Sequence, residues 1–311
     1  MSNIASKYPA QERDETEISA SKRVTLVLVA WAATLSLSKL PLVIARDFLN
    51  TDIPWINPAW IGLAFLFWAA TYLWQSLKPL RSYFLIMGAI LLMAFGVDPF
   101  IKQSAIWNNL FVDRSPMVIL FGERVILALE SLIVVMILLF IGINRQQAFL
   151  TIGNLKAPLG GSNNSTNKRR LPWSIFGTVM AILLGGLFFW FLSSQNPSAK
   201  LDISTVLPLF PLILASAALN AISEEVTYRA APLGTLSPVV GPTHALWLTS
   251  LWFGLGHYYG GIPSGPVGLI QTGLLAMLLG KAMLDTRGLG WSWIIHVVLD
   301  TVIYVSIAMT I

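Results

Sequence analysis

The chain has 311 residues, of which 55% are hydrophobic and only 11% are charged. Soluble domains carry about 25% charged residues, so this composition excludes an ordinary water-soluble protein and indicates one that crosses a membrane several times. The net charge of +5 comes from few charged residues, without a phosphate-binding glycine motif or an aromatic-basic RNA motif, so we expect basic loops at a membrane face and no nucleic-acid partner.

The first 22 residues are polar and form a predicted N-terminal tail. Runs of about 20 apolar residues follow, which is the length that crosses a bilayer. The first run has no small-residue cleavage site, so we interpret it as a retained span. We predict an all-α, polytopic transmembrane helix bundle of about eight to nine spans. The nine candidate runs are residues 25–45, 58–77, 83–97, 118–143, 173–193, 207–231, 243–260, 266–284 and 291–311.

Lys and Arg occur on alternate connections between these runs. They cluster at residues 22–23, 78–81, 145–170 and 287. Because Lys and Arg concentrate on the cytoplasmic side of a membrane, this alternation predicts a multi-pass protein with a cytoplasmic N-terminus.

A polar and basic stretch at residues 158–172 divides the chain in two. It is rich in Gly, Ser and Asn, a composition typical of linkers, and we expect it to be cytoplasmic. It separates N-terminal accessory spans (residues 23–157) from a C-terminal catalytic bundle (residues 173–311). In the accessory group, Glu123, Arg124 and Glu130 are expected to form a structural pair inside the bundle.

The run from Leu207 to Leu236 contains only three charged residues, Glu224, Glu225 and Arg229. A charge at membrane depth costs at least a few kcal/mol unless it is paired or useful. Glu225 and Arg229 are four residues apart, so they share a helix face and can form an ion pair. Glu224 is rotated by roughly 100° from Glu225 and remains free to act as a general base. The run is longer than one straight span, so we expect a tilt or a kink.

Two further polar positions lie downstream, each in an apolar segment. His257 follows Phe253, and glycines at 254, 256, 260 and 261 let helices approach closely or leave room beside the imidazole. His296 and Asp300 are four residues apart and lie on one helix face, where they could stabilise an oxyanion. An ionised Asp300 cannot donate a hydrogen bond, so it would be protonated or would orient His296. We expect three helices to bring these side chains to Glu224.

Together these segments resemble a known family. The order Glu-Glu-x-x-x-Arg, Phe-x-x-x-His and His-x-x-x-Asn/Asp, each in a separate hydrophobic segment, is similar to the motif set of the CPBP family of CAAX proteases and bacteriocin-processing enzymes, also called the ABI family. The resemblance covers about residues 170–311. The matching residues are Glu224, Glu225, Arg229, Phe253, His257, His296 and Asp300.

This resemblance implies a glutamate-dependent intramembrane endopeptidase. By analogy, Glu224 and His257 would activate a water, and His296 and Asp300 would form the oxyanion site. Glu225 and Arg229 would hold the constellation in shape. Members of the family often have Asn at the position of Asp300.

The residues by themselves favour the same reaction. The chain has no cysteine and no obvious serine dyad, so an activated water is the simplest nucleophile for amide cleavage. We expect a membrane-associated protein or peptide as substrate, the lipid bilayer as surroundings, and no cofactor.

Three alternatives remain open. In the first, Glu224, His257, His296 and Asp300 ligate zinc in a metal-dependent protease, although no His-Glu-x-x-His helix supports this. In the second, the chain is a non-proteolytic scaffold or immunity-type protein that keeps these residues for packing. The third is a proton-coupled transporter, which the lack of an inverted repeat disfavours.

Overall fold

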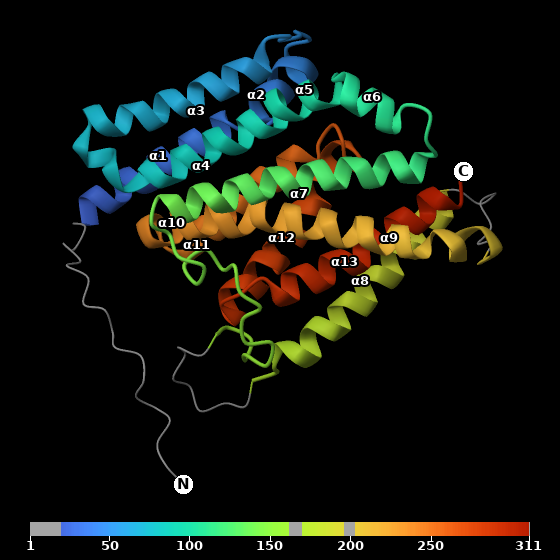
Figure 1. The fold of residues 1–311 in the computed structure, drawn as a ribbon. Coiled ribbons are helices and arrows are strands. Elements are labelled where there is room, and N and C mark those ends of the chain that lie inside the picture. Colours follow the sequence, from blue (N-terminus) through green and yellow to red (C-terminus); the bar gives the residue numbers. More distant parts are fainter. Residues whose placement is uncertain (1–19, 162–169, 196–202, 311) are drawn as a thin grey trace.

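The computed structural model describes residues 20–161, 170–195 and 203–310 of the chain. Within these residues the chain folds into helices and connecting loops, without a β-strand (Figure 1). The predicted all-α, polytopic fold is therefore confirmed. Residues 1–19 of the predicted tail and residues 162–169 of the predicted linker lie outside the described residues.

Apolar segments become helical in a membrane because a helix satisfies its backbone N–H and C=O groups internally. The α-helices are α1 (Ala20–Ser36), α2 (Leu40–Val43), α3 (Ile56–Leu73), α4 (Arg81–Leu92), α5 (Asp98–Lys102), α6 (Ala105–Phe111), α7 (Pro116–Phe140), α8 (Trp173–Gln195), α9 (Ile203–Glu224), α10 (Ala231–Val240), α11 (Pro242–Gly256), α12 (Gly265–Thr286) and α13 (Gly290–Ala308). Short π-helical stretches, η1 (Ile44–Phe48), η3 (Met93–Val97) and η4 (Glu225–Ala230), and a 3-10 helix, η2 (Gln75–Leu80), continue or link some of them.

Among the described residues, six helical stretches are long and apolar enough to cross a membrane, and a seventh forms if the bent pair Ser21–Ser36 and Leu40–Phe48 is one span. The six are Ile56–Leu73, Gln75–Lys102, Trp173–Gln195, Ile203–Val240, Gly265–Thr286 and Gly290–Ala308. Of the nine predicted runs, 25–45 qualifies only as this bent pair, and two others do not qualify. α7 carries Glu123, Arg124 and Glu130, and α11 has only 15 residues. The chain is an integral, multi-pass membrane protein.

The helices before and after the linker share one core. In Figure 1, α1, α3 and α4 lie along one side of the bundle and α8 along the other, with α7 and α9 between them. Buried Tyr83 and Phe84 belong to the same apolar cluster as Leu233 and Leu236 of α10. α7 packs directly against α9. The first group of helices therefore supports the helix that carries the glutamates.

α9, η4 and α10 form one continuous helix of 38 residues, from Ile203 to Val240. At about 1.5 Å per residue it is about 57 Å long, roughly twice the hydrocarbon thickness of a bilayer, so it must tilt or extend beyond the apolar layer. It runs past Ser237 to Val240. It stops at Gly241, whose φ of 87° no helix accommodates. The π-helical stretch begins directly after Glu224 and changes the direction of the side chains that follow.

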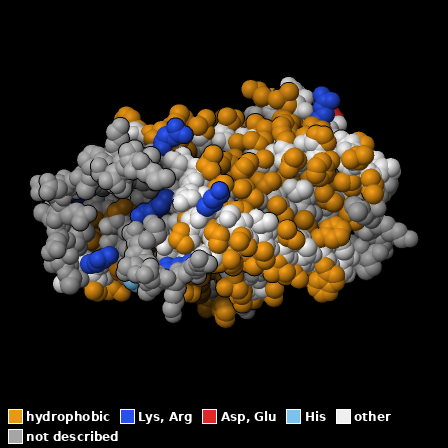
Figure 2. Space-filling model, turned by 90° about the horizontal axis from the view of Figure 1, so that it is seen from below, with side chains coloured by type: hydrophobic (Ala, Val, Ile, Leu, Met, Phe, Trp, Pro, Cys, Tyr) orange, Lys and Arg blue, Asp and Glu red, His pale blue; other side chains and the backbone are white. Residues whose placement is uncertain are grey.

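Lys and Arg side chains gather at one end of the bundle, which we call the basic end. It is formed by the turn between α3 and α4, the connection from α7 to α8 and the turn between α12 and α13, toward the left of Figure 1. Figure 2 shows Lys and Arg side chains toward the same end and hydrophobic side chains over much of the remaining face. The described residues that define it are Lys78, Arg81, Arg145, Lys156, Arg170 and Arg287.

Asp285, near the end of α12, fixes the described flanks of the linker. Its carboxylate accepts hydrogen bonds from the Gly160 backbone N–H at 2.8 Å and from Trp173 Nε1 at 3.1 Å, and it pairs with Lys281. A buried carboxylate with these partners is stabilised in its charged form. The two ends of the linker are thereby held at the basic end of the bundle.

Candidate active site

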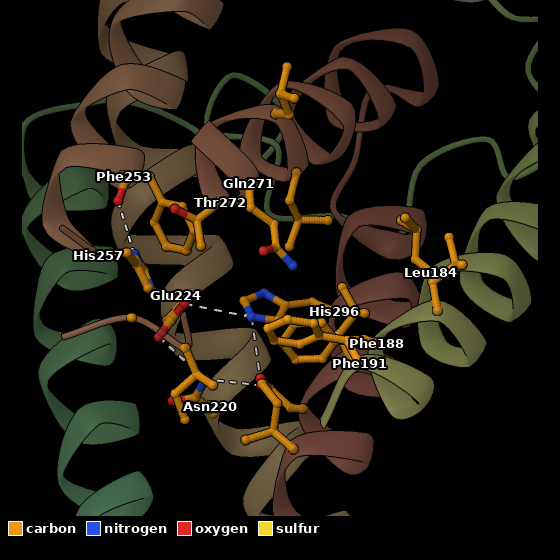
Figure 3. A pocket seen from close by; sticks show the side chains of 18 of the residues that line it. Leu184, Phe188, Phe191, Asn220, Glu224, Phe253, His257, Gln271, Thr272 and His296 are labelled. Atoms are coloured by element: carbon orange, nitrogen blue, oxygen red, sulfur yellow. Dashed lines mark hydrogen bonds and ion pairs between the residues drawn. The ribbon is translucent and has the colours of Figure 1, made fainter. Parts of the chain in front are cut away.

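A cavity of about 630 Å³ lies among α7, α8, α9, α12, α13 and the loop after α11. Leucine and aromatic side chains of α8 and α12 make much of its wall apolar. Figure 3 shows Glu224, His257 and His296 facing the same space from different parts of the chain. The residues predicted from the sequence that line the cavity are Glu224, Phe253, His257, His296 and Asp300.

Glu225 and Arg229 lie behind the cavity wall, in the protein interior. Arg229 donates from Nε to Glu225 Oε2 at 2.7 Å, and its Nη2 lies 2.6 Å from Glu225 Oε1. Both side chains are almost fully buried, with exposed fractions of 1% for Arg229 and 0% for Glu225. Glu224 pairs with no Lys or Arg of the described residues, and 19% of its side chain is exposed, toward the cavity. The two adjacent carboxylates therefore occupy different environments.

The His296 ring is oriented by Glu225. His296 Nδ1 lies 2.7 Å from Glu225 Oε1, and because a carboxylate only accepts hydrogen bonds, Nδ1 carries a proton. The Ser292 hydroxyl donates to the other carboxylate oxygen of Glu225. His296 Nε2 faces the cavity, 3.6 Å from Glu224 Oε2 and 3.6 Å from Asp300 Oδ2. This nitrogen is in position to meet a polar group of a ligand.

Asn220 joins the two carboxylates that face the cavity, and the sequence reasoning assigned it no role. Its Nδ2 donates to Glu224 Oε1 at 3.3 Å and to Asp300 Oδ2 at 3.0 Å. Since both neighbours are acceptors, the amide nitrogen and not the oxygen must face them. The sequence does indicate this role, because Asn220 is an amide in an apolar helix four residues before Glu224, so the two side chains share a helix face.

His257 sits where α11 ends and the following loop begins. Its Nδ1 donates to the backbone carbonyl of Phe253 at 2.9 Å, which leaves a lone pair on Nε2 in the neutral ring. The Phe253 ring packs against the imidazole with a centroid distance of 4.4 Å, and the Arg229 guanidinium lies 4.4 Å from the centre of that same ring. Phe253 therefore connects the position of His257 to the buried ion pair.

Glycines set the position of the His257 loop against α12. A Cβ at Gly254 would lie 2.7 Å from the carbonyl oxygen of Leu269, and a Cβ at Gly268 would lie 2.1 Å from that of Pro263. Both distances are shorter than any real contact, so α11 and the loop can lie this close to α12 only because these residues have no side chain. Gly256 and Gly260, by contrast, face open space. The glycines around His257 thus divide into those that allow close packing and those that leave room.

Residues 206–302 match the family model described as Type II CAAX prenyl endopeptidase Rce1-like. The matched region includes all three motifs. This region is similar to the CAAX proteases, the family that the three motifs resemble. No curated protein and no solved structure matches the chain significantly. The match supports a membrane protease in general, and α1 to α8 lie outside the matched region.

A charged residue of α7, outside the matched region, also lines the cavity. The sequence predicted that Glu123, Arg124 and Glu130 of α7 would form a structural pair, and that prediction is wrong. Glu123 pairs with Lys102 of α5 at 3.5 Å. Arg124 lines the cavity, and Glu130 lines a second cavity of about 70 Å³ on the other side of Glu224. The three side chains of α7 face different surroundings because successive positions of a helix point in different directions.

The zinc ligation considered from the sequence would use the side chains that face the cavity. Among the described residues, no group of three or more His, Cys, Asp or Glu side chains is arranged to hold a metal ion. His296 Nδ1 is occupied by Glu225, and the Asp300 oxygen nearest His296 accepts from Asn220. These partners compete with the zinc ligation considered from the sequence.

Proposed function

We propose that this chain is an intramembrane endopeptidase that hydrolyses a peptide bond of a membrane-associated protein or peptide. The observation that carries the proposal is the arrangement of Glu224, His257 and His296 around one largely apolar cavity. An apolar enclosure strengthens electrostatic interactions and limits the entry of bulk water, which suits a reaction with a single activated water.

In this mechanism Glu224 is the general base. A water between Glu224 and His257 donates one hydrogen bond to each, to the carboxylate and to the free Nε2 lone pair. Glu224 takes a proton as the water oxygen attacks the carbonyl carbon of the scissile bond. Glu224 then returns the proton to the amide nitrogen as the C–N bond breaks, which yields a carboxylic acid and an amine.

His296 stabilises the oxyanion that forms during the attack. In its doubly protonated form the ring donates from Nε2 to the oxyanion, while Nδ1 remains bound to Glu225. Asp300 is assigned to positioning because its carboxylate accepts from Asn220 and lies 3.6 Å from His296 Nε2. Other family members often have Asn at this position, and its amide could donate a hydrogen bond to the oxyanion. We do not assign that donor role to Asp300.

The apolar part of the cavity is proposed to hold a lipid-like part of the substrate. Its wall includes Leu184, Phe188 and Phe191 of α8 and Leu274 and Leu278 of α12. A wall of this composition buries an aliphatic chain or an apolar peptide segment favourably. A prenylated peptide, as the family description names it, fits this chemistry.

Cleavage is expected to be independent of a metal ion. The purified full-length protein in liposomes, treated with EDTA and 1,10-phenanthroline, should cleave an S-farnesyl-cysteine peptide at the rate of untreated protein, because the proposed nucleophile is activated by Glu224 and His257. Mass spectrometry of the products gives the cleaved bond and the rate. Loss of cleavage on chelation, with recovery on adding zinc, would replace this mechanism by a metal-dependent one.

The N-terminus is proposed to be cytoplasmic because the basic end carries the Lys and Arg residues. The chain has no cysteine, so single cysteines report exposure without background. In intact cells, a membrane-impermeant maleimide should label Asp113→Cys, between α6 and α7, and should leave Lys78→Cys, at the basic end, unlabelled until the cells are opened. The reverse pattern would invert the orientation.

A further inference from the structure

Arg124 is a cation that lines the reaction cavity and forms no ion pair with any described residue. Its side chain lines the cavity from α7, and its Nε is buried without a hydrogen-bond partner. Among the described residues, no carboxylate lies within 4.0 Å of its guanidinium. The ring centre of Tyr304 lies 5.8 Å from the guanidinium carbon, and Asp300 is near enough to interact with Arg124 electrostatically although it forms no ion pair with it. A cation in apolar surroundings without an anion is costly unless a ligand supplies one.

The nearby carboxylates all have other partners or face elsewhere. Glu123 and Asp98 both pair with Lys102, at 3.5 Å and 3.1 Å. Asp300 accepts from Asn220 and faces His296. Glu130 lines the second cavity and not the one that Arg124 lines. Arg124 is therefore available to an anion that enters with a ligand.

The position of Arg124 relative to the reacting groups indicates which anion this is. Tyr304 follows Asp300 by one turn of α13, about 5.4 Å further from His296. Arg124 lies beside Tyr304 and within electrostatic reach of Asp300, so it is on the side of the cavity where α13 runs away from His296. A peptide whose scissile bond lies at Glu224 would place a neighbouring part of its own chain near Arg124.

We propose that Arg124 binds the C-terminal carboxylate of the substrate, so that the chain cleaves close to a free C-terminus. The planar guanidinium donates two parallel hydrogen bonds to a carboxylate, which a neutral amide end cannot match. The inference rests on the proposed peptidase function, and it assigns a specificity role to a residue outside the region that matches the family.

The test compares two S-farnesyl-cysteine peptides that differ only at the C-terminus, a free carboxylate or a carboxamide. For the wild-type protein in neutral liposomes, we expect kcat/KM to favour the carboxylate by about 10- to 100-fold, as expected for a hydrogen-bonded charge. Arg124→Gln should lower cleavage of the carboxylate peptide to the level of the amide peptide, so that the preference between the two disappears. Arg124→Lys should keep part of the preference. Lys102→Gln, which removes a cation outside the cavity, is the matched control and should behave as wild type.

A binding measurement separates this proposal from the peptidase proposal. Fluorescence anisotropy with the same two peptides, on the Glu224→Gln protein with and without Arg124→Gln, reports carboxylate preference without turnover. A preference that disappears with Arg124→Gln supports the assignment even if no peptide is cleaved. Equal affinity for both peptides, or a preference that survives Arg124→Gln, would overturn it. Retention of a phospholipid by the wild type and not by Arg124→Gln, with equal affinity for both peptides, would assign Arg124 to a lipid phosphate instead.

Discussion

Glu224→Gln is expected to lower the rate of peptide cleavage by about 10²- to 10⁴-fold while the protein remains folded. Glutamine has the shape of glutamate, and its amide oxygen can still accept the hydrogen bond from Asn220, but it cannot take a proton from water. The measurement is kcat/KM for an S-farnesyl-cysteine peptide, together with the thermal unfolding midpoint of the purified protein.

Glu123→Gln is the matched control for this substitution. Glu123 also lies in the membrane-embedded bundle, but it pairs with Lys102 and does not line the cavity, so its variant should cleave as wild type does. In cells, C-terminal fragments that accumulate with wild-type protein and are absent with Glu224→Gln would identify natural substrates. Equal cleavage by wild type and Glu224→Gln would remove the proposed base and favour the scaffold alternative.

Arg229→Ala is expected to have the largest effect on stability, about 3–5 kcal/mol of unfolding free energy. The substitution leaves Glu225 charged and fully buried without its cation. It also removes the guanidinium that packs on Phe253, which in turn contacts His257. Unfolding of the protein in detergent is measured either by denaturant titration or by the thermal loss of the folded monomer.

Replacing both partners tests whether the loss comes from the unpaired charge. Glu225→Leu combined with Arg229→Met removes both charges and should recover much of the stability. Activity should remain low, because His296 Nδ1 then has no carboxylate partner. Lys102→Ala, which breaks a partly exposed pair, should cost under about 1 kcal/mol. An Arg229→Ala protein as stable as wild type would contradict the proposed role of the ion pair.

Much of the site followed from local spacing. Glu225 with Arg229, and His296 with Asp300, could be paired from the sequence because residues four apart on a helix share a face. Asn220 obeyed the same rule relative to Glu224 but was not assigned, since an amide in an apolar helix has several possible partners. Its second acceptor, Asp300, is 80 residues away in the sequence, and only the packing of α13 against α9 brings the two together.

Arg124 illustrates what spacing could not decide. Its neighbours in sequence suggested a pair within α7, whereas the partner of Glu123 comes from α5 and Arg124 faces a cavity formed by helices after the linker. The lengths of the apolar segments gave the number of candidate spans. They did not show which of these segments form a single helix long and apolar enough to cross a membrane. α11 is short, and it can lie against α12 because glycines remove the side chains between them.

The sequence by itself determined the membrane class, the helical fold, the buried ion pair and the set of polar residues available for chemistry, because these depend on composition and on the period of a helix. The tertiary structure alone decided which polar groups share a cavity, which nitrogen of each histidine faces it, and that a helix before the linker contributes an arginine. Those features depend on contacts between residues far apart in the chain, and no local pattern specifies them.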